Sequence, residues 1–307
     1  MNCDLVCEGG GTKISGLVGA LSALETRGFE PYCMAGTSAG AIVTAMTAAG
    51  YTSDEMRDIL DEVDFKKFKD GAPWGTKLLN LRRWKGIYRG DAFYRLMQQF
   101  MKDKGVFCFG DLKNENADRP QQQYRLNVFA ADLTRGTLVT WPRDAKIYGL
   151  NPDYLEVAWA VRTSMSIPGF FRPMRLNDSF LVDGGLLSNF PIGHFDSRGT
   201  PRHPTFGLNL HEADAGQPNE INGLFSYLEA IMKTWMEAMD KQFIRPGDLQ
   251  HRTIRIPVGQ AKATNFDITQ AQKTQLYDNG VRATNDFLHN WQWAEYVAWA
   301  KQVRGVV

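Results

Sequence analysis

The sequence has little net charge and no long hydrophobic run, and both absences exclude classes of function. Its 35 lysines and arginines offset 34 aspartates and glutamates, so bulk charge recruits no nucleic acid and we expect no such partner. No apolar run approaches the roughly 20 residues that a bilayer-spanning helix needs. The opening MNCDLVCEGGG has neither the basic segment nor the apolar core of a secretory signal. We therefore expect a cytoplasmic protein without a membrane span.

Paired cysteines and nucleotide-binding motifs are also missing. The sequence contains four cysteines without C-x-x-C spacing: Cys3, Cys7, Cys33 and Cys108. Buried thiols are the expected state, and a disulfide or a metal site is the alternative. After Gly9 and Gly11, Ile14 breaks the dinucleotide pattern G-x-G-x-x-G, and no G-x-x-x-x-G-K-[ST] phosphate loop occurs. With no zinc-ligand spacing either, we expect no metal and no organic cofactor.

What is present indicates one α/β domain over residues 1–307. A hydrophobic content of 43% can fill a large core. A short strand at Leu5 to Cys7 leads through glycines into a helical pattern that ends at Gly28, and a second strand at 32–35 leads through 36–40 into a helix that ends at Gly50. The repeated unit predicts a three-layer α/β/α fold with a central, mostly parallel sheet and helices on both faces.

Further elements are predicted along the chain. Thr52 and Glu55 fit a capping box for a helix over 53–63, and Asp91 is a candidate cap for a helix over 92–102. Residues 71–90, in which aromatic and basic residues alternate, are predicted to be an irregular loop or lid. The other expected elements are a hairpin at 124–132 and 137–141, helices at 153–162, 222–243 and 284–303, and strands at 180–182 and 205–210. The helix at 222–243 is expected to bury an apolar stripe: Leu224, Leu228, Ile231, Trp235 and Met239.

The turn Gly36-Thr37-Ser38-Ala39-Gly40 is the first candidate for chemistry. A Gly-x-Ser-x-Gly turn between a strand and a helix exposes the serine at a strained position, and the helix aims its N-terminal N–H groups at the same point. Ser38 is therefore a candidate nucleophile. The alternative is that Ser38 only caps the helix.

Two further segments are candidates for the site around Ser38, the first of them at the end of the neighbouring parallel strand. Gly9, Gly10 and Gly11 follow the neighbouring strand, and their backbone N–H groups are candidates for an oxyanion hole. Asp183 follows a short strand and precedes Gly184 and Gly185, which leaves space for approach, although an aspartate before two glycines is also a common turn former.

A Ser-Asp-His triad is formally compatible with the chain order, because all five histidines follow Asp183: His194, His203, His211, His251 and His289. An α/β-hydrolase elbow, however, normally follows several strands, whereas Ser38 follows the second. We expect these histidines to be solvated.

At this point the sequence resembles the patatin-like phospholipases, lipid acyl hydrolases built around a Ser-Asp dyad. The resemblance covers about residues 4–210 and depends on blocks in this order: GGGTKISGLVGAL at 9–21, GTSAG at 36–40, LNVFAADLTRGTLVTW at 126–141, TSMSIPGFF at 163–171 and DGG at 183–185. Residues 211–307 show no such motif, and we expect them to pack on the rest as a C-terminal helical region.

The resemblance implies a role for each matching residue. Ser38 would be the nucleophile and Asp183 its base, with oxyanion donors from Gly10 and Gly11 and help from Gly9. The supporting positions would be Lys13, Gly36, Gly40, Gly184 and Gly185. Ile14 stands where the family usually has glycine, which puts the shape of this loop in question. Pro168, Phe170 and Phe171 would shape an acyl pocket or belong to the core.

The implied activity is hydrolysis of fatty-acyl ester bonds of phospholipids or lysophospholipids through an acyl-enzyme. The alternatives are a carboxylesterase or thioesterase for soluble acyl substrates, and a catalytically silent lipid-binding regulatory module. Residues 71–90 would either touch a membrane surface or form a solvated loop. An activator and a homo-oligomer stay open.

Overall fold

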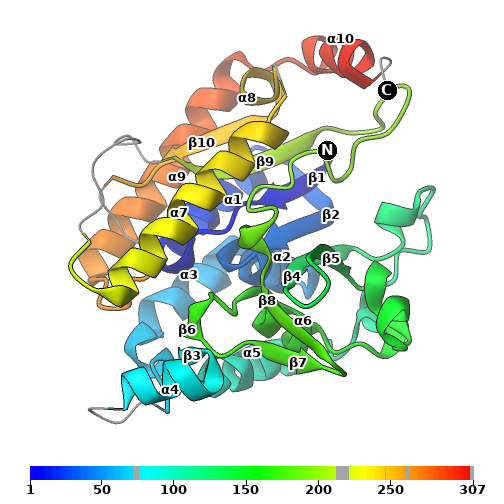
Figure 1. Ribbon diagram of the computed structural model, residues 1–307. Coiled ribbons are helices and arrows are strands. Elements are labelled where there is room, and N and C mark those ends of the chain that lie inside the picture. Colours follow the sequence, from blue (N-terminus) through cyan, green and yellow to red (C-terminus); the bar gives the residue numbers. More distant parts are fainter. Residues whose placement is uncertain (72–75, 212–220, 246, 260–262, 305–307) are drawn as a thin grey trace.

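The computed structural model describes residues 1–71, 76–211, 221–245, 247–259 and 263–304 (Figure 1). Its central sheet has eight strands, with β5 paired to β4 beside the path β10-β9-β1-β2-β4-β8-β7. The parallel strands are β1 (Asn2–Cys7), β2 (Glu30–Thr37), β4 (Leu126–Asp132), β9 (Thr205–His211) and β10 (Thr253–Pro257). The antiparallel strands are β5 (Thr137–Trp141), β7 (Met174–Leu176) and β8 (Ser179–Asp183). A separate parallel pair joins β3 (Gly86–Tyr88) to β6 (Gly169–Phe171).

Helices surround this sheet. They are α1 (Ile14–Thr26), α2 (Ala39–Ala48), α3 (Ser53–Glu62), α4 (Lys77–Trp84), α5 (Asp91–Asp103), α6 (Val157–Ser164), α7 (Leu224–Phe243), α8 (Asp248–His251), α9 (Gln270–Asn290) and α10 (Trp293–Arg304). The predicted α/β class with a mostly parallel central sheet is confirmed, as are the two strand–glycine–helix units, the hairpin of β4 and β5, and the Thr52–Glu55 capping box of α3.

The two faces of the sheet are covered differently. On one face α1 and α9 run against each other at very short range, because a Cβ on Gly280 would lie 2.1 Å from the Gly16 carbonyl oxygen. On the other face Val6, Ala35 and Phe129 pack against Phe190, Ile192 and Phe195 of the irregular segment 187–204. Arg252, directly after α8, holds that segment by donating to Asp196 at 2.6 Å. The sheet is thereby buried on both faces.

Several predicted boundaries were wrong. Asp91 does not cap α5; instead Asp70 accepts hydrogen bonds from the Gly90 and Ala92 N–H groups (2.6 and 2.9 Å). Residues 77–88, expected to be irregular, form α4 and β3, whereas 72–75 lie outside the described residues. The helix expected at 153–162 is α6, which begins at Val157.

The C-terminal third also differs from the prediction. It is not only helical, because β10 extends the central sheet beyond β9. The single helix expected at 284–303 is two helices, α9 and α10, with a break at Trp291 and Gln292. In α7 the predicted buried stripe is wrong at Ile231 and Trp235, which are about half exposed, at 46% and 49%. The side chains of Leu224 and Leu228 lie outside the description.

Among the described residues, no helix combines the length and the apolar composition that crossing a bilayer requires.

Candidate active site

Ser38 occupies a strained backbone position between β2 and α2. Its φ of +52° and ψ of −123° are rare for a residue with a side chain and cost about 1–3 kcal/mol. The flanking glycines make this turn fit, because a Cβ on Gly36 would lie 2.4 Å from the Gly40 carbonyl oxygen, and a Cβ on Gly40 would lie 2.3 Å from the Cys7 carbonyl oxygen. The absence of side chains at Gly36 and Gly40 therefore allows the strained Ser38 turn to pack against β1.

The contacts of Ser38 do not fit a simple capping role. Ser38 stands at the N-cap position of α2, but its side chain makes no capping hydrogen bond. Its hydroxyl points instead to the Met165 sulfur at 3.5 Å, and its backbone N–H donates to the Ser164 hydroxyl at 2.8 Å. The serine is only 4% exposed. The hydroxyl therefore lies in an enclosed site at the positive end of the α2 dipole.

Asp183 reaches this site from the opposite direction. It is the last residue of β8, which runs antiparallel to β4 and places Asp183 beside Ala130, while Phe129 of β4 lies beside Thr37 of β2. One step of strand register on β4 therefore separates Asp183 from the residue that precedes Ser38. The short strand predicted before Asp183 is confirmed as β8, and its antiparallel pairing with β4 brings Asp183 to Ser38.

The carboxyl group of Asp183 has a pKa closer to neutral pH than an ordinary aspartate. Burial raises the pKa of Asp183 to about 6, and the nearby Ser38 hydroxyl together with the hydrogen bond from the Gly185 N–H limits the rise. Oδ1 accepts the Gly185 N–H at 2.8 Å, whereas Oδ2 is buried without a hydrogen bond of normal geometry to a described residue. Because the Ser38 hydroxyl points at Met165, it lies near the carboxylate without a well-formed bond to it.

The glycine loop after β1 lies against the same serine. A Cβ on Gly9 would lie 3.1 Å from the Ser38 Cβ, so the loop touches the site directly. The Gly9 N–H donates to the Asn189 carbonyl at 3.1 Å and is thereby engaged. Gly11 has a φ of +55°, and its missing side chain leaves space for the Ala263 carbonyl oxygen, which accepts the Thr12 N–H at 3.0 Å. Within the described chain, the Gly10 and Gly11 N–H groups make no hydrogen bond.

The supporting residues of the sequence prediction all lie around this site. Lys13 is buried at the start of α1, and its N–H donates to the Gly10 carbonyl at 3.2 Å. Gly184 has no space for a side chain, because a Cβ would lie 2.5 Å from the Phe129 carbonyl oxygen. A Cβ on Gly185 would lie 2.8 Å from the terminal methyl of Met236, which places α7 over this turn.

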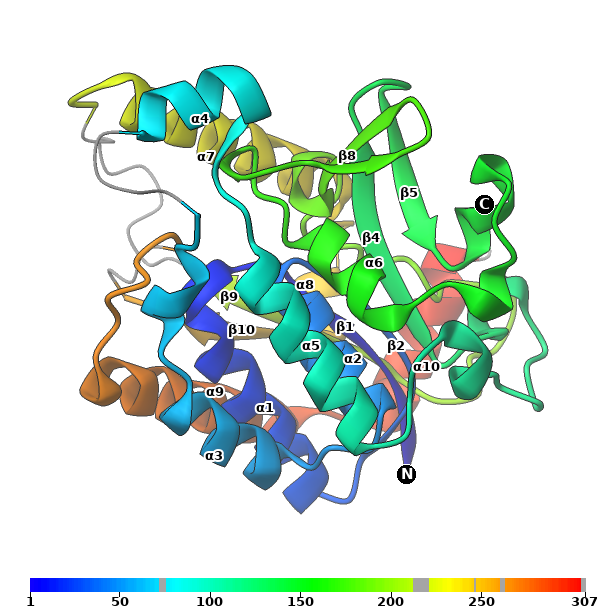
Figure 2. The same ribbon diagram turned by 90° about the horizontal axis from the view of Figure 1, so that it is seen from below.

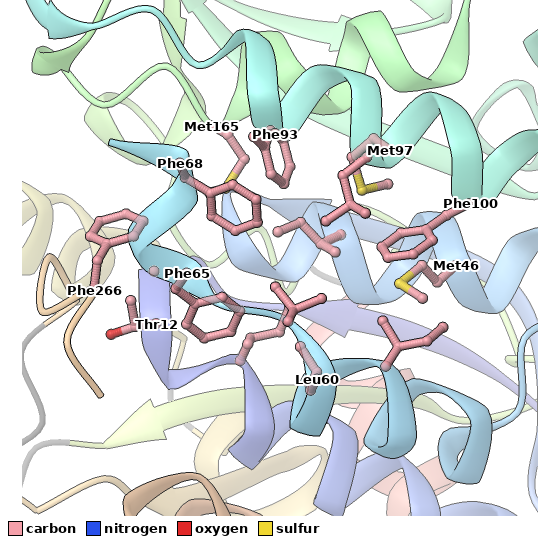
Figure 3. Close-up of a pocket in the computed structure, with 16 residues that line it drawn as sticks. Thr12, Met46, Leu60, Phe65, Phe68, Phe93, Met97, Phe100, Met165 and Phe266 are labelled. Atoms are coloured by element: carbon pink, nitrogen blue, oxygen red, sulfur yellow. The ribbon is translucent and has the colours of Figure 1, made fainter. Parts of the chain in front are cut away.

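An apolar pocket opens from the site between α2, α3 and α5 (Figure 3). Its free interior is narrow, about 50 Å³, which is below the roughly 300–1,000 Å³ of typical ligand pockets. Met165, which touches the Ser38 hydroxyl, and Gly11 of the glycine loop both line this pocket. The rest of its wall is almost entirely hydrophobic: Ile14, Ile42, Met46, Ile59, Leu60, Val63, Phe65, Phe68, Phe93, Leu96, Met97, Phe100 and Phe266.

For Phe170 and Phe171 the structure supports the core alternative and not the lining of this pocket. Phe170 and Phe171 do not line it; both are buried in the core, and Phe170 stacks on the back of the pocket residue Phe266 with ring centroids 4.9 Å apart. Pro168 does not line it either. The lining of α3 and α5 was missed, because the helical periodicity of those segments is equally typical of core packing.

The turn that ends α6 connects Ser38 to Asp183. Ser164 binds the Ser38 N–H, Met165 touches the Ser38 hydroxyl, and the Ser166 carbonyl accepts the Asp183 N–H at 3.0 Å. Arg162 supports this turn by donating to the Ser166 hydroxyl at 2.6 Å. The sequence block TSMS marked this segment, but not which side chains face the serine.

Arg162 is a buried cation held by neutral groups. It is 3% exposed and donates to the Gly90 carbonyl at 3.1 Å and the Arg172 carbonyl at 3.2 Å. Burial lowers its pKa to about 10. It thereby ties the segments that precede α5 and follow β6 to the turn after α6.

The histidines do not approach Ser38 or Asp183 in the described structure. The expectation that all are solvated was wrong for two of them. The His203 side chain is 10% exposed and its Nε2 lies 3.0 Å from Asp4 Oδ1. His194 packs between Phe129 and Phe195, and burial lowers its pKa to about 4.

The thiols follow the expectation with one exception. Cys3, Cys7 and Cys33 are free and buried, and burial raises the pKa of each, whereas Cys108 is partly exposed. Over the described ranges, no three histidine, cysteine or acidic side chains lie together in a way that would hold a metal ion.

Comparison with known proteins finds a family match over more than half of the chain. The family model of the patatin-like phospholipases matches residues 5–196. YqhO of Bacillus subtilis, an uncharacterized protein, is 37% identical over 302 residues, which cover 95% of this chain and 99% of YqhO. Lysophospholipase NTE1 of Candida glabrata is 27% identical over 233 residues, or 75% of this chain and 12% of that protein.

Solved structures share the fold. VipD from Legionella pneumophila superimposes with a TM-score of 0.57 at 18% identity, over 94% of this chain and 66% of VipD. ExoU of Pseudomonas aeruginosa, solved in complex with SpcU, gives a TM-score of 0.50 at 20% identity, over 93% of this chain and 52% of that chain. This chain therefore spans about half to two thirds of the length of these structures.

Proposed function

The chain belongs to the patatin-like phospholipase family, and from that premise we propose that it hydrolyses fatty-acyl ester bonds of phospholipids or lysophospholipids. The observation that carries the proposal is that Ser38, Asp183 and the mouth of an apolar pocket share one enclosed site. The pocket would take one acyl chain once its methionine and phenylalanine side chains move apart, since its free interior is only about 50 Å³ and its wall has almost no polar group to accept a headgroup.

The proposed reaction needs only residues of this chain. Ser38 Oγ attacks the ester carbonyl while Asp183 Oδ2 takes its proton, and the oxyanion that forms is held by the Gly10 and Gly11 N–H groups. Asp183 then gives the proton to the departing alcohol, and an acyl-enzyme on Ser38 remains. Water, deprotonated by Asp183, releases the fatty acid. Gly9 supports the loop rather than the oxyanion, because its N–H already binds Asn189.

The proposed site also explains why Met165 contacts the nucleophile. A thioether is a weak acceptor, so the hydroxyl leaves it at little cost when substrate arrives. The Ser38 hydroxyl would then turn to the unpartnered Oδ2 of Asp183.

The test is release of fatty acid from mixed phospholipid and lysophospholipid vesicles, measured by mass spectrometry. We expect release by the wild type and a loss of at least a thousandfold in Ser38→Ala and Asp183→Asn. Labelling by a fluorophosphonate should be lost in Ser38→Ala. A wild type that neither releases fatty acid nor takes the label would contradict the proposal and favour a silent lipid-binding module.

A soluble-substrate hydrolase is the second candidate, because the apolar pocket would accept the acyl chain of a soluble ester equally well. The two candidates differ in their response to substrate aggregation. A lipid hydrolase should become faster as the substrate passes from monomers to micelles, and an esterase for soluble acyl groups should not. The same assay identifies an activator requirement, which would appear as fluorophosphonate labelling without turnover.

A further inference from the structure

Helix α4 presents apolar side chains to solvent instead of to the core. Leu78 is 70% exposed, Leu79 is 62% exposed and Trp84 is 46% exposed, although the helix has only eight residues. Single exposed apolar residues need no explanation, but a short helix that exposes three of them does.

The charge around these residues has one sign. Residues 77–90 contain five basic side chains and no acidic one: Lys77, Arg82, Arg83, Lys85 and Arg89. All five are exposed. Trp84 lies between two guanidinium groups, with Arg83 at 5.1 Å and Arg172 at 4.8 Å from its ring centroid. Tryptophan flanked by arginine is typical of the polar–apolar boundary of a bilayer.

Helix α4 is firmly attached to the candidate active site. Asn80 donates to the Gly71 and Ile87 carbonyls, both at 3.2 Å, which fixes α4 to β3. β3 in turn pairs with β6, a few residues after Met165. On the N-terminal side, the chain comes to α4 from Phe68, which lines the apolar pocket. The exposed helix is therefore linked through β3 and β6 to the segment that follows Met165.

Helix α7 provides a second exposed apolar row. Tyr227, Ile231 and Trp235 follow one another at intervals of four residues, and each is about half exposed. The same helix also touches the site, because the terminal methyl of Met236 lies against Gly185 and the half-exposed Trp235 donates its indole N–H to the Leu186 carbonyl at 2.6 Å. Both views place α4 and α7 on the same side of the molecule (Figures 1 and 2).

We propose that α4 and α7 form one docking surface for an anionic lipid bilayer, with the mouth of the acyl pocket facing the bilayer. The occupant is a lipid surface because the apolar side chains would enter the acyl boundary while the five cations meet anionic headgroups. A second copy of this chain would instead bring the same cations against each other. This proposal rests on the proposed lipid hydrolysis and names the surface from which the substrate enters.

The experiment measures binding separately from hydrolysis. Full-length Ser38→Ala protein is sedimented with vesicles of phosphatidylcholine alone, or with about one third phosphatidylserine. Three double variants in that background remove parts of the surface: Leu78→Ser with Leu79→Ser, Arg82→Gln with Arg83→Gln, and Tyr227→Ser with Ile231→Ser. The matched controls remove equally exposed groups elsewhere: Ile147→Ser, and Arg95→Gln with Lys102→Gln.

We expect the parent protein to bind the anionic vesicles at least tenfold more tightly than the neutral ones. The arginine pair should lose about tenfold to thirtyfold in affinity, and each apolar pair about tenfold, while the controls bind like the parent. The same substitutions are also made in the wild-type protein, which keeps Ser38. There they should leave the turnover of a soluble short-chain ester unchanged, since none of the changed residues lines the pocket.

Two results would overturn the docking surface. One is vesicle binding that stays unchanged in all three double variants. The other is a dimer in solution that the leucine or α7 variants convert to a monomer, because the surface would then join two copies. Failure of the proposed function is distinguishable: vesicle binding by Ser38→Ala without any fatty-acid release by the wild type leaves docking standing and removes hydrolysis.

Discussion

At the scale of single residues, Asp183 predicts the pH dependence of the reaction. Its pKa, raised to about 6 by burial, must be exceeded before the carboxylate can accept the Ser38 proton. We expect kcat/KM for a soluble ester to rise about tenfold per pH unit below pH 6 and to level off above it. Rate measurements between pH 4.5 and about 8 check this, and a flat profile over that range would exclude Asp183 as the base.

The same pKa has a thermodynamic consequence that does not depend on turnover. Because the folded carboxyl holds its proton more tightly than the usual aspartate with a pKa of 3.8, folding loses stability as pH rises from about 4 to 6. The loss is about 3 kcal/mol when complete. Asp183→Asn should therefore unfold at higher denaturant than the wild type at pH 8, with a difference that disappears as pH falls toward 4.

At the scale of elements, the turn that ends α6 should act by positioning. Ser164→Ala removes the acceptor of the buried Ser38 N–H, which costs about 1–3 kcal/mol and loosens a strained serine. We expect kcat to fall tenfold or more with KM nearly unchanged, and Ser164→Thr to restore most of it. Thr163→Ala is the matched control, because the Thr163 hydroxyl donates only to the Trp159 carbonyl within the helix. Equal losses in both alanine variants would indicate general damage to α6.

At the scale of the whole molecule, the C-terminal third is predicted to be part of the same folding unit. α9 lies so close to α1 that a Cβ on Gly280 would meet the Gly16 carbonyl oxygen at 2.1 Å. Gly280→Ala should lower the free energy of unfolding by about 1–3 kcal/mol, although alanine is the better helix former. Gly223→Ala, with open space around it, should be neutral. Both are read by denaturant unfolding of the full chain.

Two results would contradict the prediction that the C-terminal third belongs to the same folding unit. If Gly280→Ala were neutral, or if a chain ending near residue 215 folded with full activity, α9 and β10 would be an accessory region.

Much of the site was predictable because its determinants are local. The strained turn at Ser38 needs glycines within two residues on either side, and the loop at Gly9 to Gly11 directly follows β1. Likewise, the order of strands, glycine turns and helices in the first 50 residues determines a parallel pairing of β1 and β2. Such patterns are written in neighbouring residues, so the sequence by itself determined the α/β class and the candidate nucleophile.

The rest depends on contacts between distant segments, which only the tertiary structure decided. Antiparallel pairing of β8 with β4 brings Asp183 toward Ser38, and burial there sets its pKa near 6. The pocket wall forms where α3 and α5 meet, and helical periodicity cannot distinguish a pocket from a core. The same holds for Ile231 and Trp235 of α7, whose apolar pattern predicted burial but whose surroundings leave them exposed. The burial of a side chain depends on which distant segments pack against it, and a local sequence pattern does not specify those segments.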